Sequence, residues 1–391
     1  MREVIRPLYS KREIERAGKV LRRTDLQVEQ FHEHYDLTTE DAFAIAHNWR
    51  NAHMVPLLKV RQDVSVKCRK FQSGALTAAR LKRMHAIRRK LQRPFTLYQI
   101  QDIAGCRAIL ADMDEVNQMV ALYRNGGSRH ELSKEDNHIA EPKPDGYRSH
   151  HLILKFRGEG DLAVFNRQTV ELQLRTRLQH VWATAVEAVG LIRREALKNG
   201  RGSEDWLRLF QLMSSEFAEL EGQPPVFTTP QSARERRSEI RDLAKRVDAP
   251  SVLDSYRVAL NLTEQWRVDP AFDRYFLLQF DYDTRQVRVE PFDEYAVGAE
   301  RYIQEETENS KRNTVLVEVD ALADLKRAFP NYFLDVTVFN SHLQDVINGL
   351  PLTAPAPEGK SPTIPRAGRQ DWDFLKNWRF WKARARQKPR F

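Results

Sequence analysis

Two carboxylates in this sequence stand at expected β-strands, where they could hold a metal ion against phosphates. Asp102 directly precedes the apolar stretch IAGCRAIL (103–110), and Glu171 lies within TVELQLRT (169–176). Both stretches have the composition of strands. Mg²⁺ takes few oxygen ligands from protein and completes its shell with substrate phosphates and water. If the two strands are neighbours, these acids predict a Mg²⁺ site that engages the phosphates of a nucleotide.

The strand that carries Glu171 has one polar face. Side chains alternate along a strand, so Glu171, Gln173 and Arg175 should point the same way, opposite to three aliphatic residues. An unpaired carboxylate or guanidinium is costly to bury. The polar face is therefore either the floor of a polar cleft or the solvent-exposed side of an antiparallel sheet, and the alternation fits both.

Cations are concentrated ahead of these strands. Residues 59–93 contain 12 Lys or Arg and a single acid, Asp63. The pattern predicts a helix over 77–92, with an apolar face and a cationic face that could neutralise phosphates. A run of charge is equally typical of a solvated surface.

The stretch KPDGYRSHHLILKF (143–156) begins with turn residues and continues as a strand. The residues before the strand, 125–146, are predicted to form a long loop, so Tyr147 stands where a loop enters a sheet. An aromatic ring in that position could stack on a nucleobase.

The whole chain has 391 residues, which suggests two domains and a tail. We expect a mixed α/β protein: a mixed β-sheet core of nucleotidyltransferase type flanked by helices, and a smaller C-terminal α+β domain. The expected division is an N-terminal helical segment (1–44), a catalytic domain (45–200), a C-terminal domain of helices followed by strands and helices (201–350), and a Pro-rich linker with a basic aromatic tail (351–391). Residues 360–391 hold 10 Lys or Arg against two acids.

Several classes of protein are disfavoured. The sequence contains no apolar run long enough to cross a membrane and no apolar centre of a signal peptide, so we expect a cytoplasmic protein without a membrane partner. Cys68 and Cys106 are the only cysteines and lack metal-ligand spacing, so neither a disulfide framework nor a zinc site is indicated.

Taken together, four stretches resemble the synthetase domain of the RelA/SpoT family, whose members transfer pyrophosphate from ATP to a ribose 3′-hydroxyl. The resemblance covers roughly residues 45–195 and rests on RLKRMHAIRRKLQR (80–93), DIAGCR (102–107), KPDGYRSHH (143–151) and ELQLRT (171–176). It implies ATP as donor, Mg²⁺ as cofactor and attack of the hydroxyl on the β-phosphorus.

The resemblance also implies a role for each matching residue. Asp102 and Glu171 match the acids associated with Mg²⁺, and Glu171 also matches the group that takes the proton from the attacking hydroxyl. The implied ATP-binding residues are Arg80, Lys82, Lys90, Arg93 and Arg107. The implied acceptor-binding residues are Tyr147, which stacks on the acceptor base, and Lys143, Gln173, His151 and Arg175.

The chain departs from the family pattern at Ala86, Asp145 and His150, where Ser, Asn and Leu are usual. The last two changes should lie beside the acceptor, so they affect its identity more than the reaction. Arg107 poses a second difficulty, because it is an odd number of residues from Asp102 and a regular strand would point the two apart; a bulge at Gly105 or strand twist would reconcile them.

The acceptor remains open between two branches of the family. One makes alarmones, (p)ppGpp, from GDP or GTP. The other modifies the 3′ end of tRNA and blocks translation, as a toxin or phage-defence protein restrained by a C-terminal domain until a protein trigger binds. The C-terminal domain and the basic aromatic tail slightly favour tRNA. A catalytically inactive nucleotide-binding module and a different nucleotidyltransferase are further alternatives, although an inactive relative should have lost Asp102 or Glu171.

Overall fold

The structure is a computed structural model of the chain. It describes residues 5–22, 37–71, 75–193, 195, 197, 202–258, 275–281, 283–284, 286–308, 312–319, 325 and 336–354. The expected basic aromatic tail lies outside these ranges.

An eight-stranded mixed sheet organises the molecule, in the order β3-β4-β5-β2-β1-β8-β6-β7. Only β5 and β2 run parallel, and the other neighbouring strands are antiparallel. The expected mixed α/β fold is confirmed. The strands are β1 (Leu76–Leu81), β2 (Ala104–Leu110), β3 (Glu131–Asn137), β4 (His150–Lys155), β5 (Thr169–Thr176), β6 (Tyr275–Asp281), β7 (Val287–Phe292) and β8 (Arg312–Glu318).

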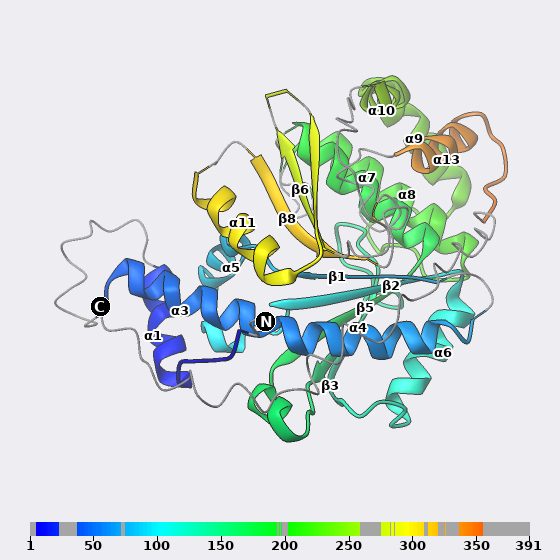
Figure 1. The fold of residues 1–391 in the computed structure, drawn as a ribbon. Helices are drawn as coiled ribbons and strands as arrows, with labels where there is room; N and C mark the ends of the chain where they lie inside the picture. The colour runs from blue at the N-terminus through cyan, green and yellow to red at the C-terminus, as the bar shows by residue number, and fades with distance from the viewer. Residues whose placement is uncertain are drawn as a thin grey trace.

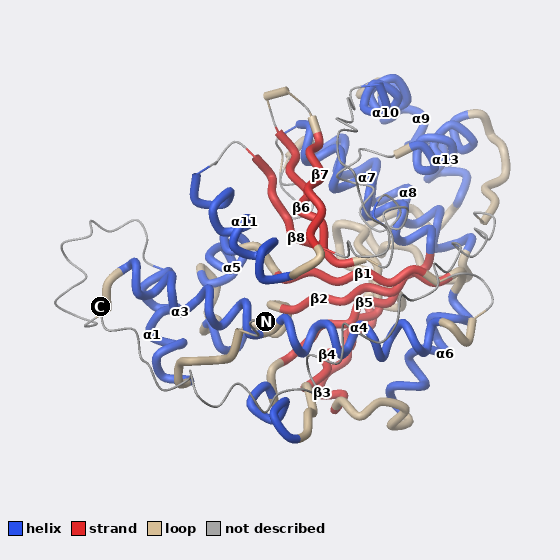
Figure 2. The backbone as a smooth tube through the Cα atoms, in the orientation of Figure 1, coloured by secondary structure: helices blue, strands red, loops and turns tan. Residues whose placement is uncertain are grey.

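Helices cover both faces of the sheet (Figures 1 and 2). Helices α4 and α6 pack on one face, and α7 and α8 pack on the other. None of the helices within the described ranges combines the length and the apolar character needed to cross a membrane. The helices are α1 (Lys11–Arg22), α3 (Thr39–Ala52), α4 (Met54–Cys68), α5 (Met84–Leu91), α6 (Met113–Arg124), α7 (Arg177–Arg193), α8 (Glu204–Leu220), α9 (Ala233–Arg246), α10 (Ala249–Val258), α11 (Tyr295–Glu308) and α13 (Thr337–Ile347), with short 3₁₀ turns at Leu97–Gln99 and Gly160–Phe165.

The helix predicted over 77–92 is wrong in its first half. Residues 76–81, LTAARL, form β1, and only Met84–Leu91 is helical. Ala, Leu and Arg favour a helix in isolation, but here β2 and β8 pair with the segment from both sides. Tertiary pairing therefore overrides local propensity.

A second difference is β3, which lies inside the long loop predicted over 125–146. Its sequence, ELSKEDN, has almost no apolar residues, because it is an edge strand that pairs only with β4. Hydrophobic alternation is absent from such a strand, and charge on an edge discourages pairing with other chains. Sequence patterns alone therefore read it as loop.

The sheet continues past residue 200. Strand β8 joins β1 through two residue pairs, Ala79 with Glu318 and Arg80 with Val317. Figures 1 and 2 show β8, β6 and β7 running steeply across the direction of β1 and β2, so the short ladder accompanies a sharp change of direction. A buried ion pair between Arg61 on α4 and Glu318 on β8 spans the same junction at 3.1 Å. The expected boundary at residue 200 stays a prediction, but the chain on its two sides shares one sheet.

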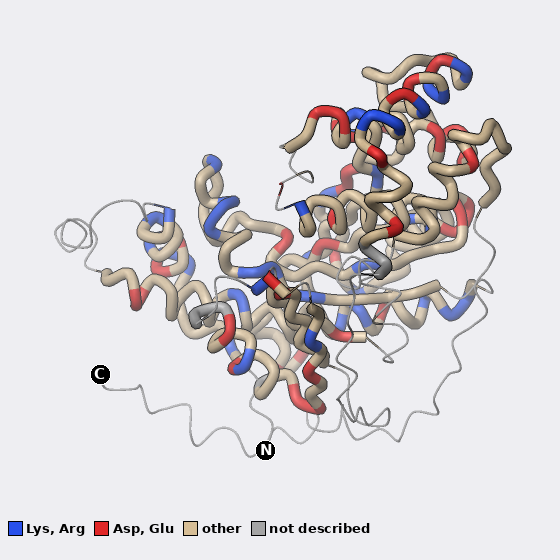
Figure 3. The backbone as a smooth tube through the Cα atoms, turned by 90° about the horizontal axis from the view of Figure 1, so that it is seen from above, with Lys and Arg blue, Asp and Glu red and all other residues tan. Residues whose placement is uncertain are grey.

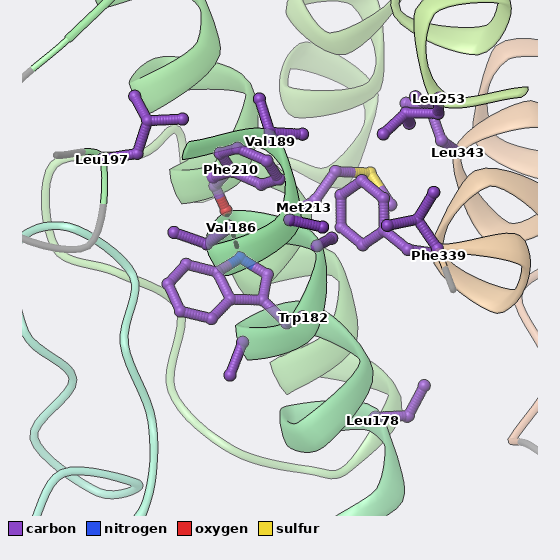
Figure 4. Packing of buried hydrophobic residues seen from close by; sticks show 14 of the residues in the cluster. Leu178, Trp182, Val186, Val189, Leu197, Phe210, Met213, Leu253, Phe339 and Leu343 are labelled. Carbon is purple, nitrogen blue, oxygen red and sulfur yellow. Dashed lines mark hydrogen bonds between the residues drawn. The ribbon is translucent and has the colours of Figure 1, made fainter. Parts of the chain in front are cut away.

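The largest apolar cluster also unites the two sides of that boundary. Trp182 and Val186 on α7 pack in it with Phe210 on α8 and Phe339 on α13 (Figure 4). The ring centroids of Phe210 and Phe339 are 5.5 Å apart. Removing the chain after residue 200 would expose this apolar surface of α7 to water.

We predict that Phe339→Ala destabilises the whole protein by about 3 to 5 kcal/mol, because it empties a site that is 0% exposed. Denaturant unfolding followed by tryptophan fluorescence and by far-UV circular dichroism should show one transition shifted to lower denaturant. Phe227→Ala, at a ring that is 74% exposed, is the control and should leave the midpoint in place. If only a minor early transition moved while a major one stayed, the two sides of residue 200 would unfold independently.

Candidate active site

The polar face predicted for β5 is the face that α7 and α8 cover in part. Register places Gln173 between Arg107 on β2 and His151 on β4, and Glu171 between Gly105 and Ile153. Neighbours in register point to the same side of a sheet. The face is therefore a partly covered polar face rather than an open solvent face.

Side chains on this face form a closed ring of hydrogen bonds. Arg175 Nη2 donates to the Tyr147 hydroxyl at 2.8 Å and to Gln173 Oε1 at 2.9 Å. Gln173 Nε2 donates to Glu171 Oε2 at 2.6 Å. The Tyr147 hydroxyl lies 2.9 Å from His151 Nε2, and His151 Nδ1 lies 3.0 Å from Glu171 Oε1. The residues expected to bind the acceptor thus contact one another and the expected catalytic acid.

The ring has a direction. A guanidinium can only donate and an ionised carboxylate can only accept, so both branches run from Arg175 to Glu171. The Tyr147 hydroxyl accepts from Arg175 and is free to donate to His151 Nε2, which leaves the Nδ1 proton of His151 for Glu171. A His151 tautomer that donates from Nδ1 and accepts at Nε2 satisfies every member. Both branches therefore end on the carboxylate of Glu171.

Glu171 is held as an anion. Burial acts to raise its pKa, but the hydrogen bond from His151 and the amide of Gln173 outweigh burial, and the pKa lies well below its ordinary value. The carboxylate is 14% exposed, so a hydroxyl group can reach it. Glu171 can accept a hydrogen bond throughout the neutral pH range.

Two lysines clamp Asp102. Lys82 Nζ lies 2.6 Å from Asp102 Oδ2 and Lys90 Nζ lies 2.9 Å from Oδ1. Lys82 follows β1 and Lys90 belongs to α5, so the lysines approach from different elements. Burial acts to raise the pKa of Asp102, but the two ammonium groups lower it below its ordinary value. Burial lowers the pKa of Lys82 although Asp102 opposes that effect.

The two acids are close enough to interact, since the charge of Glu171 acts to raise the pKa of Asp102. Among the residues that the structure describes, no group of three or more His, Cys, Asp or Glu forms a metal cluster. Two carboxylates fit Mg²⁺ nonetheless, because this ion is commonly bound by one or two protein carboxylates together with substrate phosphates. The donor set is chemically suited to Mg²⁺ bound with a nucleotide.

Guanidinium groups border the acids on the same face. Arg80 on β1 lies opposite Gly105, and Arg107 lies beside Gln173. Burial, together with the neighbouring Arg175, lowers the pKa of Arg107 to about 9. Clustered cations repel one another, and an anionic ligand such as a polyphosphate would relieve that repulsion.

The expected bulge at Gly105 is not needed. The β2 register is regular from Ala104 to Leu110 against both neighbours. Asp102 precedes the strand, so strand alternation does not fix where its side chain points. Arg107 lies on the same face of the sheet as Glu171 without a bulge in β2. The expectation failed because it extended the strand rule into a turn.

The Tyr147 ring is surrounded by cations and imidazoles. Lys143 Nζ lies 4.9 Å from the ring centroid and the Arg175 guanidinium carbon 5.1 Å. His138 was missed by the sequence analysis; its ring centroid is 5.2 Å from that of His151 and 6.2 Å from that of Tyr147. A histidine inside a predicted loop carries no periodic signal, and only the turn that follows β3 brings it here.

Three further residues named in the sequence analysis, Arg93, Asp145 and His150, lie in different places. Arg93 lies just after α5 with an exposed side chain, apart from the contacts around Asp102. Asp145 accepts a hydrogen bond from the Tyr147 backbone N–H at 3.0 Å. His150 does not lie beside the acceptor side as expected: it pairs in register with Leu174, so it points to the opposite face, where it contacts Glu135. Because adjacent residues of a strand point to opposite faces, His150 lies on the other side of the sheet from His151.

Charge is mixed rather than segregated around the site. Figure 3 shows basic and acidic residues interleaved along the described helices. The cationic stretch at 82–93 includes lysines that are already paired with Asp102. The predicted cationic face therefore contributes side chains to the polar site around Asp102 and is not only a solvated surface.

Comparisons with known proteins agree with these observations. Residues 79–190 match the family model described as the region found in RelA / SpoT proteins. Over 144 residues the chain is 27% identical to GTP pyrophosphokinase YjbM of Bacillus subtilis strain 168, covering 35% of this chain and 67% of that protein.

Solved structures of similar proteins include two small alarmone synthetases of Bacillus subtilis. Synthetase 2 is 21% identical, with 45% of this chain and 93% of that chain covered and a TM-score of 0.39. Synthetase 1 bound to its product pppGpp is 22% identical, with 44% and 93% covered and a TM-score of 0.37. The family match spans β1 through α7, the elements that carry most of the polar face and the clamped acid. Residues 79–190 therefore contain the region found in RelA / SpoT proteins.

Proposed function

We propose that this protein transfers pyrophosphate from ATP to the 3′-hydroxyl of GDP or GTP. The observation that carries the proposal is the ring of hydrogen bonds that ends on Glu171, beside an acid clamped by two lysines. This arrangement supports a role for Glu171 in binding a hydroxyl group and a role for Asp102 in binding a metal-bound polyphosphate. The match to the RelA/SpoT family supports the same reaction.

The donor half of the site would bind ATP through its charges. Lys82 and Lys90 now neutralise Asp102, and phosphates would compete for the same ammonium groups. Asp102 and Glu171 would hold Mg²⁺, which supplies charge neutralisation for the phosphates when bound. Arg80 and Arg107 offer planar cations for the adenine or for phosphate oxygens.

The acceptor half would use Tyr147 and Glu171 together. The ring of Tyr147 would stack on a base if the exposed Lys143 ammonium, now 4.9 Å from the ring centroid, moved aside, and its hydroxyl would stay tied to Arg175 and His151. Glu171 would accept the hydrogen bond of the 3′-hydroxyl and orient its oxygen. A carboxylate with so low a pKa is a weak base, so the proton would move late, which suits a loose phosphoryl-type transition state.

A guanine nucleotide is favoured over tRNA as acceptor by the likeness, over 144 residues, to a GTP pyrophosphokinase. The arguments for tRNA were the separate C-terminal domain and the basic tail. Strands after residue 200 now extend the catalytic sheet, and the tail lies outside the described residues. Modification of tRNA, restraint by the C-terminal half and a protein trigger therefore stay predictions.

An acceptor assay tests the proposal. The full chain, incubated with Mg²⁺ and ATP labelled at the γ-phosphate, should label GDP or GTP and release AMP in equal amount, both resolved by chromatography. Deacylated tRNA is the second acceptor in the same assay. Label on tRNA alone would replace the guanine acceptor with the tRNA alternative, and label on none of them would overturn the proposal.

Glu171 and Tyr147 should have separable roles. We expect Glu171→Gln to lower kcat about 10²- to 10⁴-fold, because the amide cannot take a proton. Tyr147→Ala should mainly raise the KM for the acceptor, whereas Tyr147→Phe keeps the ring for stacking and should lower kcat more than it raises this KM. Steady-state kinetics with each substrate varied measures the difference. If Tyr147→Ala left the acceptor KM unchanged, the base would lie elsewhere.

Lys90 should serve the donor rather than the acceptor. Lys90→Met is expected to raise the KM for ATP about tenfold, the effect of losing one charge-assisted hydrogen bond, with little change in the acceptor KM. Lys70→Met removes the same charge from an exposed position and serves as control. Equal effects of the two substitutions would mean that only overall charge matters.

A further inference from the structure

The loop that presents Tyr147 has a backbone shape that constrains its neighbours. Gly146 has φ +93°, which favours glycine, and its N–H donates to the Lys143 carbonyl at 2.8 Å. A Cβ at Gly146 would lie 3.0 Å from the Ser214 Cβ and 3.0 Å from the Trp182 ring. The loop is therefore packed tightly against helices α7 and α8.

Helix α8 lies beyond the family match, yet it bonds directly to this loop. The Ser214 hydroxyl donates to the Gly146 carbonyl at 2.6 Å and accepts from Arg148 Nε at 3.1 Å. Ser214 is 2% exposed. A single hydroxyl thus links the residues on both sides of Tyr147.

Arg148 extends the same link. It is 3% exposed, donates through Nη1 to the Ile139 carbonyl at 2.9 Å and through Nη2 to the Pro224 carbonyl at 2.7 Å. Burial lowers its pKa to about 10, although Glu221 opposes the shift. The Arg148 guanidinium therefore connects the acceptor loop to Ile139, which precedes the loop, and to Pro224, which follows α8.

Resting on the proposed function, we propose that α8 braces the acceptor loop, and that Ser214 and Arg148 are positioning residues for the acceptor. A loop held in its binding conformation loses less entropy when the ligand arrives. The brace fixes the backbone of Gly146 and Arg148, so the intervening Tyr147 ring stays where the ring of hydrogen bonds can hold its hydroxyl. Chain outside the family-matched region therefore helps to set acceptor affinity.

The neighbouring serine provides a matched control. Ser215 is also on α8 and 0% exposed, but its hydroxyl contacts Thr229 at 2.8 Å and accepts from the Val226 N–H at 3.0 Å, away from the acceptor loop. Ser214→Ala and Ser215→Ala each remove one buried hydroxyl from the same helix. A general loss of stability should be similar in both.

The experiment compares these two variants in the full-length protein. Ser214→Ala should raise the acceptor KM about tenfold and leave the ATP KM within about twofold, whereas Ser215→Ala should leave both near wild type. Amide hydrogen exchange of residues 143–149, measured by mass spectrometry, should quicken in Ser214→Ala and not in Ser215→Ala.

Two results would overturn the brace. One is an equal rise of the acceptor KM in both variants, which would indicate a structural effect alone. The other is unchanged exchange of residues 143–149 in Ser214→Ala. The exchange measurement needs no turnover, so the brace can be tested even if the proposed reaction is wrong. A wrong reaction would be recognised separately, because the wild-type protein would then transfer no pyrophosphate.

Discussion

The structure depends on satisfying one partly buried carboxylate on the face of a sheet. The side chain of Glu171 is 14% exposed, and an anion without partners in such a position carries a large desolvation cost. Arg175 and Glu171 lie on the same strand. One path of hydrogen bonds connects them through Gln173, and a second path connects them through Tyr147 and His151. The charge pair is thereby neutralised without direct contact between its members. The same bonds fix the Tyr147 ring, so the stabilisation of the carboxylate and the geometry of the proposed acceptor site depend on the same contacts.

The chain after residue 200 enters the site from two directions. On the acceptor side, Ser214 of α8 bonds the loop that carries Tyr147. On the donor side, Arg50 donates to the Lys82 carbonyl at 2.6 Å, while its guanidinium lies 4.6 Å from the centroid of the Tyr302 ring on α11. Lys82 is one of the lysines that clamp Asp102. Elements outside the family-matched region therefore hold the backbone at both ends of the site.

The sequence located β2 and β5 better than the elements around them. β5 was located correctly, and alternation placed Glu171, Gln173 and Arg175 on one face, because a regular strand obeys a local rule. β1 was read as helix, since its partner β8 lies more than 200 residues away and no local pattern reports that pairing. His138 and the Ser214 contact were missed for the same reason: the turn that holds His138 and the helix that holds Ser214 are brought near Tyr147 by tertiary packing alone. Asp102 was paired with Glu171 because both stand at expected strands, and its lysine clamp became visible only when β1 and α5 were placed.

The shared core changes how a regulatory role for the C-terminal half can be studied. A chain ending near residue 200 would lose α8 and α13, against which Trp182 and Val186 pack, and the Ser214 bond to the acceptor loop would go with them. Loss of activity in such a truncation would report damage to the core, and toxicity from it would have to arise despite that damage. Single substitutions at the contacts with α8 and α11 alter the two halves of the site separately while the core stays filled. They can therefore distinguish an element that restrains the site from one that completes it.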